Sequence, residues 1–301
     1  MSSLLVCVQP ATGHPDGFLP PDCPAVLLKQ LSAKAHLTPV TPASRLEVRA
    51  APEVVSSGIA EIDALTGGLP RGCLTEIYGP VSSGRSSFLL AALSAATRRQ
   101  EACALVDVSD AFHPQSALEA GIEFRNLLWV RCDTERRNLK QHRNSRKSEP
   151  ERFFVSRDGR LVSNATQKLW ETCLEQALKA TDLLLQSGGF GQVSIDLSDV
   201  PIEAARRIPL TSWFRFRRAV ENTATVLLVI TRGPCTGTCS SLLLRLREPC
   251  NVPGSPKTNS PAHAELLCGL PLFSELVRSR LESKPAQRNH IDFETKTAWA
   301  R

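Results

Sequence analysis

The chain has 301 residues, of which 42% are hydrophobic, and its formal net charge of +6 indicates only a mild preference for anionic partners. This length accommodates one large domain, or one domain with small attachments. The sequence has no signal-peptide pattern and no apolar stretch that approaches the length of a membrane span. We therefore expect a cytoplasmic protein without a membrane partner. Ten cysteines are scattered without metal-ligand spacing, so we expect no zinc site.

Residues 1–44 are rich in proline and glycine. We expect them to form a flexible segment with one short helix, Ala25 to Leu31, and we place the start of the main core at residue 45. Glu47 to Val55 is expected to be an extended strand or a linker. Ile59 to Leu65 predicts a short helix that is closed by two glycines.

The most informative stretch runs from Glu76 to Ser87 and predicts a strand, a glycine-bracketed loop and a helix. Gly79 and Gly84 occupy the two fixed glycine positions of a phosphate-binding P-loop, but Arg85 stands where the signature has lysine. A P-loop points successive backbone N–H groups at one anion. A ligand-free Gly/Ser turn could have the same sequence. The residues that we expect to bind the phosphates of ATP are Gly79, Pro80, Ser82, Ser83, Gly84, Arg85, Ser86 and Ser87, with Ser86 also a ligand of Mg²⁺.

After this loop the chain alternates between helices and apolar strands. Ser87 to Arg99 has apolar residues at helical spacing, and Ala102 to Asp107 is an apolar run that ends in an acid. Ser116 to Gly121 predicts a short helix, and Leu127 to Val130 predicts the next strand. Strands that are apolar on both sides indicate a parallel sheet with helices on both faces.

Residues 134–165 interrupt the alternation, and their first part, Thr134 to Arg152, is basic and has almost no apolar side chains. We favour a solvated, disordered insertion. An arm that follows the phosphates of DNA would have the same composition, so this alternative stays open.

Regular structure returns with an amphipathic helix, Leu169 to Leu185, and a strand, Val193 to Asp196, that ends in an acid. In P-loop proteins an acid at this place holds Mg²⁺, so we favour Asp196 as a metal ligand. The alternative is that Asp196 only caps the following turn.

Arginines and aromatic residues are interleaved between Arg206 and Val220. Side chains of these two kinds can stack on bases and grip phosphates, which predicts contact with nucleic acid. A helix with its aromatic face in the core and its arginines in water fits the pattern equally well. The arginines that we expect to contact nucleic acid are Arg206, Arg207, Arg215, Arg217 and Arg218.

The last third of the chain begins with two apolar strands, Thr225 to Thr231 and Leu242 to Arg247. Asn251 to Pro261 has the composition of a linker. Phe273 to Leu281 and His290 to Thr295 alternate apolar and polar residues, which predicts antiparallel edge strands within 270–296.

These features resemble the RecA family of recombination ATPases. The resemblance rests on the run Glu-Ile-Tyr-Gly-Pro-x-Ser-Ser-Gly at 76–84 and on the lead-in from Ser57 to Gly72. It covers residues 45–130 well and 170–247 more loosely. It implies an α/β fold with a RecA-like P-loop core, in which helices flank a mostly parallel twisted sheet and antiparallel strands follow at the C-terminus. It also implies ATP and Mg²⁺ as ligands and single-stranded or damaged DNA as a partner.

Taken residue by residue, the resemblance implies that the ATPase apparatus has changed. The P-loop lysine is replaced by Arg85, and the position of the general base falls on Ser109. Because loss of a positioned base costs about 10²–10⁴-fold in rate, we do not expect brisk hydrolysis. The family's DNA loop is shortened to Gly233 through Ser240. The two adenine-contacting positions and the γ-phosphate sensor fall on His113, Ser116 and Arg232.

Changes of this kind resemble the ImuA-type proteins, RecA relatives that act as accessory factors in the SOS response. That resemblance implies a role in DNA repair, recombination and damage-induced mutagenesis, with an error-prone translesion polymerase as a partner, and it leaves self-association open. The alternatives are an active DNA-dependent ATPase, in which Arg85 serves as the cation, and a nucleotide-free interaction scaffold. Arg85, Ser109, Ser116 and Arg232 all disfavour the ATPase.

Overall fold

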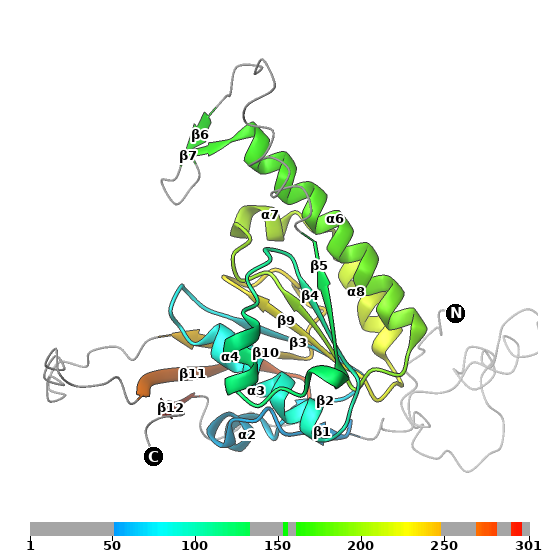
Figure 1. Ribbon diagram of the computed structural model, residues 1–301, viewed down its shortest axis with the longest axis vertical. Helices are drawn as coiled ribbons and strands as arrows, with labels where there is room; N and C mark the ends of the chain where they lie inside the picture. The colour runs from blue at the N-terminus through cyan, green and yellow to red at the C-terminus, as the bar shows by residue number, and fades with distance from the viewer. Residues whose placement is uncertain (1–50, 133–152, 156–160, 248–268, 282–289, 297–301) are drawn as a thin grey trace, which may run out of the picture. The chain divides into compact units, whose positions relative to one another are not determined.

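An eight-stranded sheet forms the centre of the molecule, in the strand order β12-β11-β10-β3-β9-β8-β4-β5 (Figure 1). A computed structural model describes residues 51–132, 153–155, 161–247, 269–281 and 290–296. Six neighbouring strands are parallel, and β11 and β12 add to one edge in antiparallel orientation. This mixed sheet confirms the predicted fold class. The sheet strands are β3 (Cys73–Tyr78), β4 (Cys103–Asp107), β5 (Leu127–Arg131), β8 (Gln192–Asp196), β9 (Val226–Thr231), β10 (Leu242–Arg247), β11 (Gly269–Ser279) and β12 (His290–Lys296).

Helices cover both faces of the sheet because side chains of successive strand residues point to opposite faces. On one face the side chains of Leu74 and Leu227 pack with Trp213 and Phe216. On the other face Ile77 and its neighbours pack with the first helices of the chain. The first face carries α6 (Asn164–Ser187), α7 (Ile202–Arg206) and α8 (Leu210–Val220), and the second carries α2 (Ala60–Thr66), α3 (Arg85–Arg98) and α4 (Pro114–Glu119) (Figure 1).

The carboxyl ends of four neighbouring strands lie side by side at one end of the sheet, which we call the carboxyl edge or sheet edge. Tyr78 at the end of β3 pairs with Thr231 of β9, and Asp107 of β4 pairs with Asp196 of β8. In open α/β sheets ligands bind outside this edge, where loops leave the strands in different directions. The loops after β3, β4, β8 and β9 are therefore the part of the fold that can form a site.

Three parts of the chain differ from expectation or lie outside the described residues. Helix α6 begins at Asn164 rather than Leu169, because its polar first residues give no hydrophobic periodicity. Within the range predicted as a disordered insertion, β6 (Phe153–Val155) and β7 (Leu161–Ser163) pair as antiparallel strands. The predictions for residues 1–44, for most of the basic segment and for the linker after β10 fall outside the described residues. Three short elements complete the list: β1 (Val54–Val55), β2 (Leu69–Pro70) and the 3-10 helix η2 (Phe124–Asn126).

Candidate nucleotide and DNA sites

The P-loop sequence forms a tight curl between β3 and α3. Gly84 has φ 83° and Ser82 has φ 64°, so two left-handed residues turn the backbone before the helix begins. Gly79 is equally constrained, because a Cβ there would overlap the carbonyl oxygen of Leu246 and the hydroxyl of Ser83. Helix α3 has no side-chain cap at its N-terminus and no acidic residue in its first turn. Its first backbone N–H groups are therefore open to an anion.

Arg85 directs its guanidinium to the next loop of the sheet edge. Its side chain is only 6% exposed, and Nη1 donates to the carbonyl oxygen of Ser198 at 3.1 Å. Arg232 donates from Nε to the same oxygen at 3.1 Å. Burial lowers the pKa of Arg85; the negative charges of Asp196 and Asp199 oppose this shift, and the positive charge of Arg232 adds to it. Among the described residues no carboxylate lies within ion-pair distance of Arg85, so these acids act on the guanidinium without direct contact.

Asp196 ends β8 at the same edge and is 7% exposed. Its Oδ1 accepts from the backbone N–H of Ser198 at 2.9 Å, so it caps the following turn, as one of the two sequence alternatives has it. Burial raises the pKa of this carboxyl, and the nearby Asp107 acts in the same direction. Ser86, the other residue predicted to hold magnesium, is exposed, and no hydrogen bond joins it to Asp196 in the described part of the chain. A role of either residue in metal binding stays a prediction.

The raised pKa of Asp196 predicts a pH-dependent stability. The folded protein holds this proton more tightly than the unfolded chain, so the contribution is favourable at low pH and is lost as pH rises above the ordinary value of 3.8. Asp196→Asn is therefore expected to raise the midpoint of thermal unfolding at pH 7 and to have little effect near pH 3.5. Asp199→Asn, the same change at an exposed neighbour, is the control. A lower midpoint for Asp196→Asn at pH 7 would show that the ionised carboxylate stabilises the fold.

The positions that correspond to the family's base and adenine contacts are engaged in local structure. His113 accepts from the backbone N–H of Ser116 at 3.2 Å and lies 3.0 Å from its hydroxyl, so together they cap α4. Asp110, with φ 56°, forms a bidentate ion pair with Arg131, at 2.6 Å for each contact. Ser109, the residue before Asp110, is half-buried. No carboxylate therefore stands at the position of the general base.

Two of the five arginines that were predicted to contact nucleic acid form ion pairs within the protein. Arg207 pairs with Glu171 at 3.2 Å, and Arg215 pairs with Asp182 of α6 at 2.9 Å. In the described residues Arg206, Arg217 and Arg218 have no ion pair, so their charges are available to a partner. The aromatic residues of α8 differ in burial. Trp213 and Phe216 lie in the core, whereas Phe214 is exposed.

The sequence did not show the role of Glu76, a fully buried acid in the middle of β3. Its carboxyl group accepts from the backbone N–H of Cys235 at 2.7 Å, and from the backbone N–H of Thr236 at 3.4 Å and its hydroxyl. On the other side of this loop Arg278 of β11 donates to the carbonyl of Gly237 at 2.7 Å and to Ser240. Glu76 therefore fixes the start of the shortened loop after β9, and Arg278 fixes its middle and its end. The only signal was an acid inside an otherwise apolar strand.

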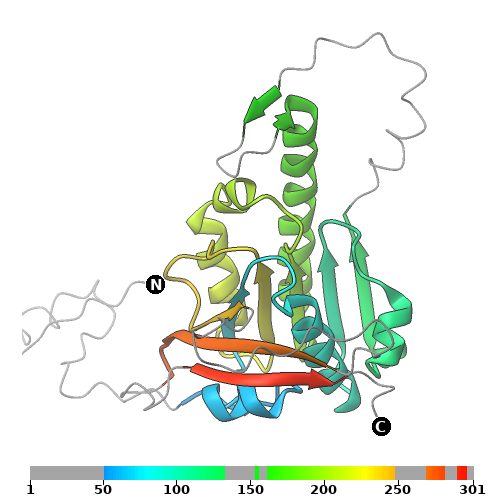
Figure 2. The same cartoon turned by 90° about the vertical axis from the view of Figure 1, so that its left-hand side faces the viewer.

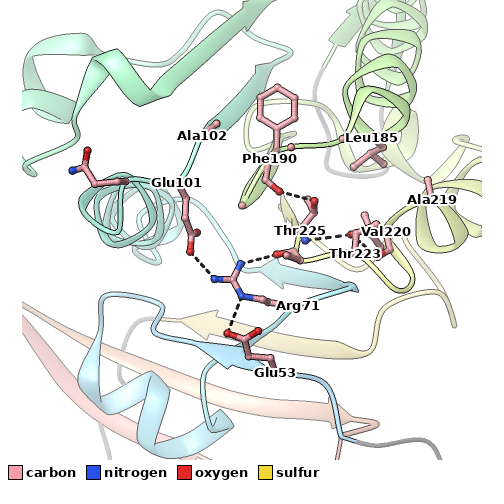
Figure 3. Close-up of a pocket in the computed structure, with 15 residues that line it drawn as sticks. Glu53, Arg71, Glu101, Ala102, Leu185, Phe190, Ala219, Val220, Thr223 and Thr225 are labelled. Atoms are coloured by element: carbon pink, nitrogen blue, oxygen red, sulfur yellow. Dashed lines mark hydrogen bonds and ion pairs between the residues drawn. The ribbon is translucent and has the colours of Figure 1, made fainter.

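A cavity of about 500 Å³ lies at the other end of the sheet, beside the amino-terminal ends of the parallel strands (Figure 3). Figure 3 shows Arg71 between two acids at its centre. Arg71 donates to Glu101 at 2.6 Å and to the carbonyl of Ala224 at 2.6 Å, and it lies 3.4 Å from Glu53. Nε of Arg71 makes no hydrogen bond among the described residues, but its charge is balanced by the two acids. The cluster explains how the amino-terminal ends of the strands are held together, and we assign it no ligand.

Comparison with known families finds a match in the first half of the chain. A family described as the RecA N-terminal domain matches residues 42–149, which include the P-loop, α3, β4 and β5. In the described residues no helix is long and apolar enough to cross a membrane. The same residues contain no group of three or more His, Cys, Asp or Glu side chains that could hold a metal ion.

Proposed function

Residues 42–149 match the RecA N-terminal domain, and on that premise we propose that the chain is a RecA-like DNA repair and recombination protein that binds DNA and turns over ATP slowly or not at all. Its P-loop would hold the phosphates of ATP through the open backbone N–H groups at the start of α3, with Arg85 as the cation and Asp196 beside the Mg²⁺. At the finer level we propose an accessory factor of the SOS response that acts with an error-prone translesion polymerase, as the ImuA-type resemblance implies.

The observation that carries the proposal is the shared contact of Arg85 and Arg232 with the carbonyl of Ser198. Two guanidiniums side by side repel each other, and a phosphate between them would relieve that repulsion. The same arrangement disfavours catalysis. A guanidinium is a broad planar fork, so it fits inside a P-loop less closely than the compact ammonium of lysine and positions the transferred phosphate less well. Ser109 supplies no base for the attacking water.

A nucleotide-free scaffold is the second candidate, and one observation favours it. The carbonyl of Ser198 already accepts a hydrogen bond from Arg85, so the protein itself partly satisfies the cation that a phosphate would otherwise neutralise. In this case the curl at 79–84 would persist because it packs against the C-terminal strands, since a Cβ on Gly84 would meet Leu272 of β11.

Calorimetry with ATP and ADP in the presence of Mg²⁺ separates these functions. We expect magnesium-dependent binding that weakens at least tenfold in Asp196→Asn and is unchanged in Asp199→Asn. We also expect hydrolysis that stays about 10²-fold or more below that of an enzyme with a positioned base, with or without single-stranded DNA. The absence of binding at millimolar nucleotide would favour the scaffold. Rapid DNA-stimulated hydrolysis would favour the ATPase and contradict the proposal.

A further inference from the structure

The three C-terminal strands present an open face on the side of the sheet away from α2. Their face toward α2 is apolar, because Leu244, Leu246, Leu272 and Phe293 join the core there. Figure 2 shows β11 and β12 side by side along this edge, with α2 against one side of them. In the described residues the remaining helices cover the central strands rather than this edge. The outward side chains of β10 to β12 therefore form a surface that the fold itself does not use.

Strand register lines up the residues on this surface. Arg245 of β10 pairs with Tyr78 of β3 on one side and with Glu275 of β11 on the other, and Glu275 pairs with His290 of β12. In the next row Arg247 pairs with Phe273, and Phe273 pairs with Asp292 of β12. In the row on the other side of Arg245, Leu243 pairs with Arg278. Paired residues share a face of a sheet. We call this surface the C-terminal platform: Tyr78, Arg245, Arg247, Phe273, Arg278 and His290.

Aromatic rings and guanidiniums on the platform contact one another. The guanidinium carbon of Arg247 lies 4.0 Å from the centre of the Phe273 ring. The ring of His290 stacks on Phe273 with centroids 5.4 Å apart and planes inclined by 17°. The contacts join the three side chains in a row across three strands, with Arg247 and His290 against the ring of Phe273. Rings and guanidiniums have flat faces of the kind on which bases stack.

The platform carries charges of both signs. Among the described residues, three acids share its face by register: Glu275, Asp292 and Glu294. Glu275 lies 3.8 Å from Arg245, with both side chains partly exposed. The Nε atoms of Arg247 and Arg278 are buried without a hydrogen-bond partner in the described part of the chain. Next to the platform, Arg280 is exposed. An anionic partner would supply hydrogen-bond acceptors to these arginines.

We propose that the C-terminal platform binds single-stranded DNA, with phosphates on Arg245, Arg247 and Arg278 and bases against the ring row of Phe273 and His290. The inference rests on the proposed DNA binding and assigns it to a surface outside the loops at the sheet edge. An acidic protein segment would satisfy the charges but not use the row of rings. A duplex would hide its bases inside. A single strand matches both features, because it exposes phosphates along one side and π-faces along the other.

Fluorescence anisotropy with a labelled oligo-dT of about 20 nucleotides, over a series of salt concentrations, tests the platform on the full chain. We expect Arg245→Gln with Arg247→Gln to weaken binding at least tenfold and to reduce the slope of log K against log salt by about 1.4, since each phosphate contact on a single strand contributes about 0.7. Phe273→Leu, which keeps an apolar side chain but removes the ring, is expected to weaken binding about tenfold. Arg125→Gln is the matched control, because it removes an exposed positive charge that lies near the start of β5.

The outcomes distinguish the platform from DNA binding as such. If the unmodified protein does not bind oligo-dT at low salt, the proposed DNA binding fails and the platform fails with it. If it binds, but only Arg217→Gln with Arg218→Gln weakens the complex, DNA lies on α8 and the platform is overturned while the proposed function stands. Competition by polyglutamate as effective as by unlabelled oligo-dT would identify an acidic protein partner and also overturn it. Loss of binding in the platform variants alone, with unchanged thermal midpoints, supports the inference.

Discussion

Replacement of Glu76 by Ala is expected to lower the free energy of unfolding by about 3–5 kcal/mol. Glu76 is fully buried, and it accepts hydrogen bonds from Cys235 and Thr236, including a backbone N–H of each. Removal of the carboxyl group leaves these donors without partners inside the protein, where each buried unsatisfied group costs about 1–3 kcal/mol. Water cannot easily replace the carboxyl, because the loop lies directly over the strand.

Urea denaturation followed by circular dichroism measures this loss. Glu119→Ala, which removes an exposed carboxylate on α4, is the control and is expected to change the unfolding free energy by less than about 0.5 kcal/mol. Glu76→Gln keeps an oxygen for Cys235 but places an amide donor against the N–H of Thr236, so an intermediate loss is expected. A decrease below 1 kcal/mol for Glu76→Ala would mean that the loop after β9 is held mainly by Arg278.

The sheet could be predicted from the sequence because buried parallel strands carry an unmistakable pattern. Ala102 to Asp107 and Thr225 to Thr231 are apolar at every position or nearly so, and both lie in the sheet as expected. The alternating pattern of the C-terminal strands correctly indicated antiparallel strands at one edge of the sheet. What alternation could not show is which polar residues meet across strands, because the register of β10 on β11 includes an irregularity between Leu243 and Leu244.

Partners far apart in the sequence explain most of what could not be predicted. The arginines of α7 and α8 form one pattern along the chain, yet Arg207 and Arg215 are neutralised by acids of α6 and the others are not. Glu76 was part of the most informative stretch, but its partners are two residues of a loop that follows four further parallel strands, β4, β5, β8 and β9. Periodicity identifies faces of an element, and it carries no information about which distant side chain lies opposite.

The same limit applies to Arg85. The sequence showed that an arginine replaces the P-loop lysine, and from its size we inferred a changed loop. Its contact with the carbonyl of Ser198, shared with Arg232, depends on how the loops after β8 and β9 meet at the sheet edge. The backbone of the P-loop was predictable because glycine positions define a curl. The direction of the Arg85 side chain could not be predicted, because it depends on a residue more than 100 positions away.

Arg85→Lys combined with Ser109→Glu is expected to raise ATP hydrolysis by about 10²-fold over the unmodified protein. The lysine restores a compact cation within the loop and leaves Arg232 alone on the carbonyl of Ser198. The glutamate supplies a base at the end of β4, one residue after Val108, whose N–H donates to the carbonyl of Asp196 at 3.4 Å. We expect the lower end of the range for a positioned base, because the cap formed by His113 and Ser116 is left in place.

Steady-state phosphate release, with and without single-stranded DNA, measures the gain. Ser109→Gln in the Arg85→Lys background is the control, since glutamine has the shape of glutamate but cannot accept the proton. A third change, Asp196→Asn, is expected to remove the gain if this acid holds the metal. If the double variant binds magnesium and ATP more tightly but hydrolyses no faster, the loss of activity lies beyond these two side chains. In that case the sheet edge itself, with the short loop fixed by Glu76, has moved away from a geometry that supports catalysis.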